Sequence, residues 1–230
     1  MTIAENIARI RANMAAAARE AGRDPKEILL VGASKMNDAA ACQEAIAAGV
    51  DALGENRVQE MVQKLEQHAY DGAPLHFIGH LQRNKVKQVV GHVALIQSVG
   101  SLELLDEIEK VAAARGLVQD ILLEVNIGRE AAKSGFAPEK VLPAAEAALE
   151  RTHVRVRGLM TIPPADAQRD ANFRYFQEVQ ALYVDMNQKL FHNELEYLSM
   201  GMSGDYEDAI RAGATMVRVG SAIFGARHYN

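Results

Sequence analysis

The sequence predicts an α/β fold, a single (β/α)8 TIM barrel preceded by an additional N-terminal helix. Eight short apolar segments with the composition of strands alternate with helical patterns along the 230 residues. No linker rich in proline, glycine or serine and no change of composition interrupts this alternation, so residues 1–230 are expected to form one domain. A closed barrel leaves no strand edge unpaired, which favours it over an open sheet.

The first expected element is a helix between Thr2 and Gly22. Thr2 and Glu5 have the spacing of a capping box, and apolar residues recur every three or four positions as far as Ala17. Gly22 is a typical helix stop. The first strand is expected at 28–34, an unbroken apolar run that is too short for a helix and typical of parallel strands covered on both faces.

Further segments have the features of strands, and they lie at 50–53, 75–78, 94–97, 121–125, 154–160, 195–199 and 216–219. Helical patterns span 39–48, 58–68, 102–115, 139–150 and 173–190, and a shorter one spans 206–212. The competing fold is a doubly wound open sheet, which usually carries a Gly-x-Gly-x-x-Gly turn after its first strand. Here Gly32 is followed by Ala33-Ser34-Lys35, so the barrel is preferred.

The composition narrows the classes of function. With 25 Lys and Arg against 30 Asp and Glu, the net charge of −5 argues against a dedicated binder of nucleic acids or anionic membranes. One cysteine excludes a disulfide framework and suits the reducing cytosol. The N-terminus lacks the pattern of a signal peptide, and no apolar run approaches the ~18 residues of a membrane span. These features lead us to expect a cytoplasmic protein. The histidines show no metal-ligand spacing, so no metal site is expected.

Functional residues of such barrels lie at the carboxyl ends of the strands. Lys35 follows the first strand, and its amine would lean into the barrel mouth, partly desolvated. Such an amine is a suitable nucleophile for forming a Schiff base with an aldehyde or ketone. The alternative for Lys35, taken alone, is an ordinary solvated side chain at a strand end.

Two loops that contain glycine and serine follow the last two strands, at 199–204 and 218–222. Glycines let backbone N–H groups approach an anion closely, and many barrels bind phosphate in these two loops. The alternative is that the glycines serve only turns and packing. Together with Lys35 and an inward-pointing Arg218, the loops suit an aldehyde that carries a phosphate ester, such as pyridoxal 5'-phosphate. A barrel aldolase acting on a phosphorylated sugar would share two of these features.

Several segments resemble, in order, the signatures of the pyridoxal phosphate homeostasis proteins, the YggS-like family. They are 54–60 (GENRVQE), 76–85 (HFIGHLQRNK), 158–164 (GLMTIPP), 198–203 (LSMGMS) and 218–225 (RVGSAIFG). The resemblance covers nearly the whole chain. It implies a barrel like the N-terminal domain of alanine racemase, with pyridoxal phosphate carried on the lysine after strand one.

The resemblance also implies roles for individual residues. Lys35 would form the internal aldimine with the cofactor, and Asn56 would line the pocket beside it. Ser203 would hold the phosphate together with the backbone N–H groups of Gly220 and Ser221.

Arg218 would face the pyridine nitrogen of the cofactor. A permanently charged guanidinium donates a hydrogen bond and keeps that nitrogen unprotonated. The ring is then a poorer electron sink, which disfavours transamination or decarboxylation.

The sequence departs from the family pattern after strand one. The family commonly continues Ser-Lys-Thr-Lys-Pro, whereas residues 34–38 read Ser-Lys-Met-Asn-Asp, so the second lysine is absent. The lysine of the family's strand-five loop is retained as Lys133, which makes it the candidate for any secondary handling of the cofactor.

The expected function is a non-catalytic binder that stores pyridoxal phosphate and delivers it transiently to apo-enzymes. The alternative is a racemase-like enzyme that uses the same cofactor. Alanine racemases need a second β-domain and a partner subunit that supplies a catalytic tyrosine, and the expected strands use the chain to about Phe224. No catalytic residue is therefore assigned. Because no long apolar stripe demands a partner, we expect a monomer.

Overall fold

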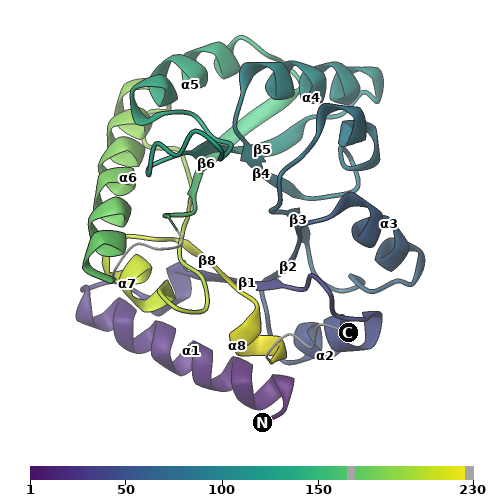
Figure 1. The fold of residues 1–230 in the computed structure, drawn as a ribbon, viewed down its shortest axis with the longest axis vertical. Helices are drawn as coiled ribbons and strands as arrows, with labels where there is room; N and C mark the ends of the chain where they lie inside the picture. Colours follow the sequence, from purple (N-terminus) through teal and green to yellow (C-terminus); the bar gives the residue numbers. More distant parts are fainter. Residues whose placement is uncertain (165–168, 226–230) are drawn as a thin grey trace.

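The computed structural model of the chain describes residues 1–164 and 169–225, and it confirms the predicted barrel. The parallel strands form a closed sheet in which each strand pairs with the next and β8 pairs with β1 (Figure 1). The strands are β1 (Leu29–Ala33), β2 (Ala52–Glu55), β3 (Leu75–Phe77), β4 (Leu95–Val99), β5 (Gln119–Val125), β6 (Val154–Thr161), β7 (Tyr197–Ser199) and β8 (Met216–Val219).

Helices cover the outside of the barrel. The α-helices are α1 (Ile3–Glu20), α2 (Ala39–Ala47), α3 (Val58–Glu66), α4 (Leu102–Ala114), α5 (Val141–Leu149), α6 (Arg169–Leu190), α7 (Tyr206–Arg211) and α8 (Ser221–Phe224). Short 3-10 turns precede or replace helices at η1 (Pro25–Glu27), η2 (Arg83–Gln88) and η3 (Pro138–Lys140). Every helix expected from the sequence is present, and α8 is a short helix that the sequence patterns did not predict.

Two strands begin two residues later than the sequence predicts, for local reasons. The stretch expected at 50–53 becomes a strand only at Ala52, because Gly49 adopts a left-handed conformation with φ 95° and Val50 N–H donates back to Ala45 O at 3.2 Å. Residues 49–50 therefore form the turn that ends α2 and are not yet part of the strand. The strand expected from 195 begins at Tyr197, because Leu195 N–H donates to the Asn187 side chain of α6 at 3.0 Å.

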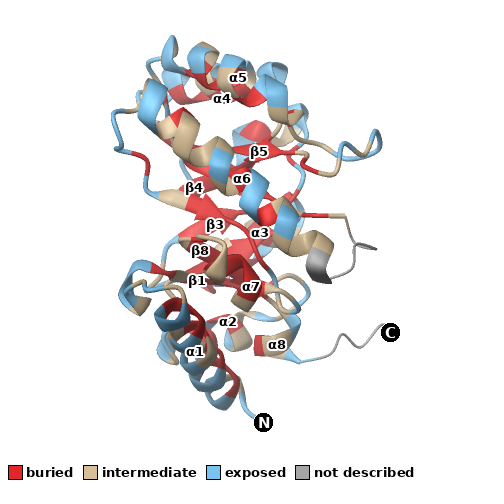
Figure 2. Cartoon of the chain, turned by 90° about the vertical axis from the view of Figure 1, so that its left-hand side faces the viewer, coloured by how far each residue is buried: buried red, intermediate tan, exposed pale blue. Residues whose placement is uncertain are grey.

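The apolar core has an inner and an outer part. Inward-facing side chains of the strands fill the barrel, and they are Val31, Ala52, Leu95, Leu122, Met160 and Met216. Residues of opposite alternation pack against the surrounding helices and form the larger outer core. Figure 2 shows the strands as buried segments between helices whose outer faces are exposed. Strands buried on both faces explain the unbroken apolar runs of the sequence.

The N-terminal helix α1 covers the barrel wall beside α7 and α8 (Figure 1). Thr2 caps it in a capping box with Glu5, and its buried stripe includes Ile7, Ile10 and Met14. The Asn6 side chain donates to Ile223 O of α8 at 2.9 Å, which is a buried hydrogen bond. Since α7 and α8 have only 6 and 4 residues, α1 supplies the cover that these short helices leave open. Within the described residues, no helix has the length and apolar composition to span a membrane.

Candidate functional site

Lys35 lies in the turn between β1 and α2, at the carboxyl end of the barrel where functional residues are expected. Its side chain is half-buried. Met36, the next residue, has φ 63°, a left-handed conformation that a non-glycine residue adopts at a cost. Asn37 N–H donates to Ser34 O at 3.1 Å and closes the turn around the lysine.

Two of the three residues that depart from the family pattern, Asn37 and Asp38, have a structural role in this turn. The Asn37 side-chain amide donates to Lys35 O at 3.0 Å, and Asp38 accepts from Ala41 N–H at 2.8 Å as the N-cap of α2. Asn37 thus occupies the position of the family's second lysine. Its side-chain amide donates to the backbone carbonyl of Lys35, which is the first lysine.

The loops after β7 and β8 converge on the Ser203 side chain. Its hydroxyl accepts from Gly220 N–H and from Ala222 N–H, both at 3.3 Å. The family resemblance implied that the backbone N–H groups of Gly220 and Ser221 hold the phosphate of the cofactor, which stays a prediction. In the structure Ser221 lies between the two donors and is exposed. The Ala222 donor had no sequence signal, because its direction follows from the first turn of the short helix α8.

The phosphate-loop candidate and the Lys35 turn belong to neighbouring strands. β1 and β8 pair in parallel, with Gly32 beside Val219. A Cβ atom at Gly220 would lie 3.2 Å from Ala33 O, which is tighter than ordinary contact. The absence of a side chain at 220 therefore lets the loop after β8 lie against the strand that leads to Lys35.

Arg218 lies inside the barrel and is 3% exposed. Its Nη1 donates to Ser199 Oγ at 2.5 Å, and its Nη2 donates to Thr161 O at 2.9 Å. Burial lowers the pKa of Arg218 to about 10, against the opposing influence of Asp205 and Glu124. The guanidinium therefore remains charged at neutral pH.

A chain of buried hydrogen bonds continues from Arg218 across the barrel. Ser199 Oγ donates to Gln97 Oε1 at 2.7 Å, and Gln97 Nε2 lies 3.0 Å from His76 Nδ1 and 3.1 Å from Met216 Sδ. Burial lowers the pKa of His76 to about 4, so the ring is neutral at pH 7 and Nδ1 can accept from the amide. Each group in this series of hydrogen bonds donates to the next, from Arg218 towards His76. Sequence reasoning missed these residues, because their inward alternation shows only once the strand register is known.

Asn56 follows β2 at the same end of the barrel. Its Oδ1 atom is buried and has no hydrogen-bond partner among the described residues. A carboxamide offers either its oxygen or, when rotated, its N–H₂ group, so Asn56 can take one further polar partner of either kind. The backbone at Asn56 is closely packed, since a Cβ atom at Gly79 would lie 2.1 Å from Asn56 O.

Lys133 lies on the opposite side of the barrel mouth from the strand-eight loop. Its Nζ pairs with Glu130 Oε2 at 2.6 Å, and it lines a cavity of about 620 Å³ with His80, Arg83 and Ser134. Ser134 donates to Glu124 Oε2 at 2.9 Å, and burial raises the pKa of Glu124. This cavity lies beside the loops that follow β3, β4 and β5, and it shares no lining residue with the Ser203 loop.

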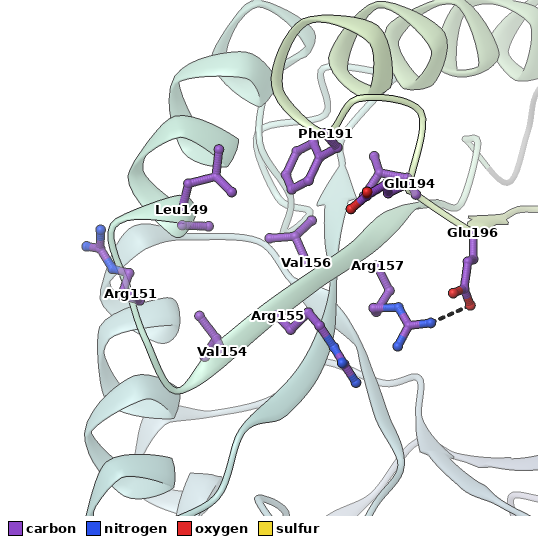
Figure 3. Close-up of a pocket in the computed structure, with 11 residues that line it drawn as sticks. Leu149, Arg151, Val154, Arg155, Val156, Arg157, Phe191, Glu194 and Glu196 are labelled. Carbon is purple, nitrogen blue, oxygen red and sulfur yellow. Dashed lines mark ion pairs between the residues drawn. The ribbon is translucent and has the colours of Figure 1, made fainter.

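A further cavity of about 500 Å³ lies at the amino end of the barrel, between the end of α5, the start of β6 and the connection from α6 to β7 (Figure 3). Its floor is apolar, and its arginines are engaged in ion pairs. Arg155 and Arg157 pair with Asp120 at 2.7 Å, and Arg157 also pairs with Glu196. Residues at this end of a barrel usually serve stability, and the paired arginines fit that role.

The described residues contain no group of three or more His, Cys, Asp or Glu side chains placed to hold a metal ion. The chemistry that the carboxyl end offers is instead an amine, a buried cation and convergent N–H donors. These groups suit an anionic ligand with an electrophilic carbon.

Comparison with known proteins identifies similar chains. Residues 6–228 match the model of the alanine racemase N-terminal domain. A pyridoxal phosphate homeostasis protein of Pseudomonas aeruginosa is 42% identical over 228 residues, which cover 99% of this chain and 97% of that protein.

Solved structures resemble the fold as well. The PipY protein of Synechococcus elongatus, solved with PLP bound, has a TM-score of 0.84 at 31% identity, covering 97% of this chain and all of that one. An alanine racemase of Clostridium difficile has a TM-score of 0.72 at 18% identity, and the match covers 98% of this chain but 58% of the racemase. This second likeness concerns the barrel fold alone.

Proposed function

This chain belongs to the family of pyridoxal phosphate homeostasis proteins, and from that membership we propose that it binds pyridoxal 5'-phosphate at the carboxyl end of its barrel. The proposed role is to hold the cofactor on Lys35, to buffer its free concentration and to release it to apo-enzymes that need it. PipY, a family relative of the same fold, has PLP bound in its structure.

The observation that carries the proposal is the convergence of two backbone N–H groups on Ser203 beside the strand that leads to Lys35. Gly220 and Ala222 both donate to the Ser203 hydroxyl, so an anion placed there would meet two N–H donors and one O–H donor. The unpartnered Oδ1 of Asn56 and the charged Arg218 add two polar groups that fit a planar heterocycle with a ring nitrogen and a phenolic oxygen attached to the ring.

Each residue has a distinct part in this binding. Pyridoxal phosphate supplies, when bound, an aldehyde that reacts with amines and a ring that can delocalise charge. Lys35 provides the amine. Ser203 and Gly220, with Ser221 and Ala222 in the first turn of α8, orient the phosphate, and Asn56 lines the ring. Arg218 donates to the ring nitrogen and keeps it unprotonated.

A storage role without a dedicated reaction follows from this set of groups. A ring nitrogen that faces a charged guanidinium cannot take up a proton easily, so the ring accepts electron density poorly. A racemase also needs a second proton donor opposite the lysine. The alternative function, a racemase-like enzyme, predicts exchange of the α-hydrogen of an amino acid for deuterium in a manner that depends on Lys35.

We further propose that residues 1–230 act as one domain and as a monomer, and that the protein works in the cytoplasm. The barrel uses strands from both ends of the chain in one sheet, which supports a single cooperative unit. The single thiol, Cys42, is buried in α2 against the outer core, as suits a reducing compartment.

The first test is absorbance and borohydride labelling. Wild-type protein mixed with pyridoxal phosphate should turn yellow, and borohydride should fix the label on Lys35 as shown by peptide mapping. Lys35→Ala should lose the fixed label and keep its circular dichroism spectrum, whereas Lys26→Ala, an exposed lysine just before β1, should label normally. A wild-type protein that stays colourless would refute the proposal.

A second test addresses Arg218. Arg218→Ala should weaken retention of the cofactor during dialysis, because the donor to the ring nitrogen is lost. Arg218→Lys, which keeps a charge in the barrel, serves as the folding control. Unchanged retention in both variants would contradict the contact assigned to Arg218.

A further inference from the structure

A buried cluster of charges lies directly behind the Lys35 turn, between the barrel and α3. Glu55 ends β2 and is 0% exposed, and Lys64 of α3 is 5% exposed. Lys64 Nζ lies 2.5 Å from Glu55 Oε1 and 2.8 Å from Glu60 Oε1. Nothing in the proposed cofactor site uses these groups. The alternation of β2 places Glu55 on the outer side of the sheet, and Glu60 and Lys64 belong to α3, which covers that side.

The cluster holds the backbone on both sides of Lys35. Before the lysine, Lys64 Nζ donates to Ser34 O at 2.8 Å, and Ser34 Oγ donates to Glu55 Oε1 at 2.7 Å. After the lysine, Met36 N–H donates to Glu60 Oε1. The residue that carries the amine is thus flanked by two backbone positions that are fixed by one charged cluster.

The turn needs such support because of its conformation. Met36 has φ 63°, and a residue with a side chain persists in this left-handed region only where its surroundings fix it. Its side chain is 54% exposed and cannot supply that support by packing. The hydrogen bond from Met36 N–H to Glu60 therefore adds to the Asn37 hydrogen bonds that close the turn, and it holds the backbone at Met36 itself.

The charge state of the cluster agrees with this role. Burial by itself would lower the pKa of Lys64, but the hydrogen bonds to Glu55 and Glu60 raise it above the ordinary value, so the ammonium stays charged. A buried ion cluster contributes little net stability compared with apolar packing of the same volume. Its specific effect is to fix directions, here those of the Ser34 carbonyl and the Met36 amide.

We propose that Lys64 and Glu60 are positioning residues for Lys35, which set the direction from which its amine meets the aldehyde of the cofactor. The inference rests on the proposed function. In the step concerned, the neutral amine attacks the aldehyde carbon, a C=N bond replaces the C=O bond, and the oxygen leaves as water with the two amine protons. No oxidant or reductant is needed, so orientation is what the turn contributes.

The test compares Glu60→Ala, Glu60→Gln and Lys64→Met with wild type, with Glu66→Gln as the control on the same helix. Glu66 is exposed, whereas Glu60 is partly buried in the cluster. Two quantities are measured for each. One is the rate at which pyridoxal phosphate becomes fixed to Lys35, trapped by borohydride at successive times. The other is the dissociation constant of pyridoxine 5'-phosphate, which has the phosphate and ring but no aldehyde.

The proposal expects Glu60→Ala and Lys64→Met to slow the labelling of Lys35 by about tenfold or more. Their affinity for pyridoxine 5'-phosphate should stay within about twofold of wild type, because the phosphate loop is untouched. Glu60→Gln should recover much of the rate, since its carboxamide oxygen can still accept from Met36 N–H. A purely structural role would slow the labelling of Lys35 and raise the dissociation constant of pyridoxine 5'-phosphate together.

Hydrogen exchange of the Met36 amide without cofactor provides an independent readout. It should accelerate in Glu60→Ala and remain slow in Glu60→Gln. Labelling at the wild-type rate in Glu60→Ala, or equal loss of labelling and of pyridoxine 5'-phosphate binding, would overturn the proposal. If wild type takes no label, the proposed function fails instead, and the Met36 exchange alone then decides whether the cluster holds the turn. Should Lys64→Met fail to fold, the two Glu60 variants decide the question.

Discussion

Arg218 is a charged side chain held inside the barrel by neutral groups. Its two hydrogen bonds go to a serine hydroxyl and a backbone carbonyl, and the chain of donors that follows ends on a neutral His76. Because Gln97 uses both amide hydrogens, on His76 Nδ1 and Met216 Sδ, its orientation is determined. Protonation of His76 would place two donors against each other and break the chain.

Stability should therefore depend on the protonation of His76. The pKa of His76 is about 4 in the folded protein against 6.5 ordinarily, so between these values the unfolded chain binds a proton that the folded protein excludes. Stability from this residue is intact above pH 6.5 and falls as the pH drops, by roughly 3 kcal/mol once the pH is below 4. Urea unfolding at pH 7, 5 and 4 measures this loss.

The matched variant is His76→Gln, whose carbonyl oxygen can accept from Gln97 without titrating. Subtracting its pH dependence from that of wild type removes the contributions of all other groups. An identical pH dependence in the two proteins would contradict the role given to His76.

The residues of the candidate site differ in how far the sequence alone could place them. Lys35, Ser203 and Gly220 could be found because they follow strands whose ends are visible as apolar runs, and Arg218 because it lies within the last of these runs. Glu55 and Lys64 could not. A lysine four positions after Glu60 on a helix has the spacing of an ordinary surface ion pair. Only the packing of α3 against β2 shows that Lys64 is buried and pairs with Glu55 as well.

Helix α1 connects the start of the chain to the candidate phosphate loop. Its Asn6 donates to Ile223 O in α8, and the first turn of α8 contains the Ala222 amide that points at Ser203. The additional N-terminal helix thus supports the element that carries the candidate anion donors. The short α8, with its 4 residues, has no helical period that a sequence pattern could reveal.

Asn6→Ala should accordingly lower both stability and affinity for the cofactor. The substitution leaves the buried Ile223 carbonyl without its donor, which costs roughly 1–3 kcal/mol. Denaturant unfolding measures the first effect, and titration with pyridoxine 5'-phosphate measures the second. Ala16→Gln, at an exposed position of α1, should change stability by less than about 0.5 kcal/mol. Full affinity in Asn6→Ala would show that α8 is held by other contacts.

The fold was predictable to the level of strands and long helices, because burial on both faces gives apolar runs and burial on one face gives a helical period. Strand starts were less predictable. The strands begin at Ala52 and Tyr197, after the last hydrogen bonds between the preceding segment and its helix. For Ala52 this point depends on the left-handed Gly49, and for Tyr197 on the Asn187 side chain. Such local contacts leave no periodic signature.

The candidate site joins the first strand of the barrel to the last two. Lys35 follows β1, Ser203 follows β7 and Gly220 follows β8, so a ligand that touches all three ties together segments from both ends of the chain. Binding of pyridoxal phosphate should then stabilise the barrel as a unit.

At a free concentration one hundred times its dissociation constant, a ligand of the folded state adds about 2.7 kcal/mol. For a chain of this size the melting temperature should rise by roughly 5–11 °C. Differential scanning calorimetry with and without pyridoxal phosphate measures the shift. Lys35→Ala keeps only the non-covalent contacts, so the same concentration of pyridoxal phosphate should raise its melting temperature by less. An equal rise in both proteins would show that attachment to Lys35 does not contribute to the stabilisation.

The pairing of β1 with β8 also determines when the site can exist during synthesis. The segment with Lys35 leaves the ribosome early, but β1 keeps one unpaired edge until β8 has been made, and Ser203 and Gly220 emerge long after Lys35. The growing chain therefore carries a reactive amine without the groups that would orient an aldehyde toward it. We therefore expect the capture of pyridoxal phosphate by Lys35, Ser203 and Gly220 together to follow closure of the barrel.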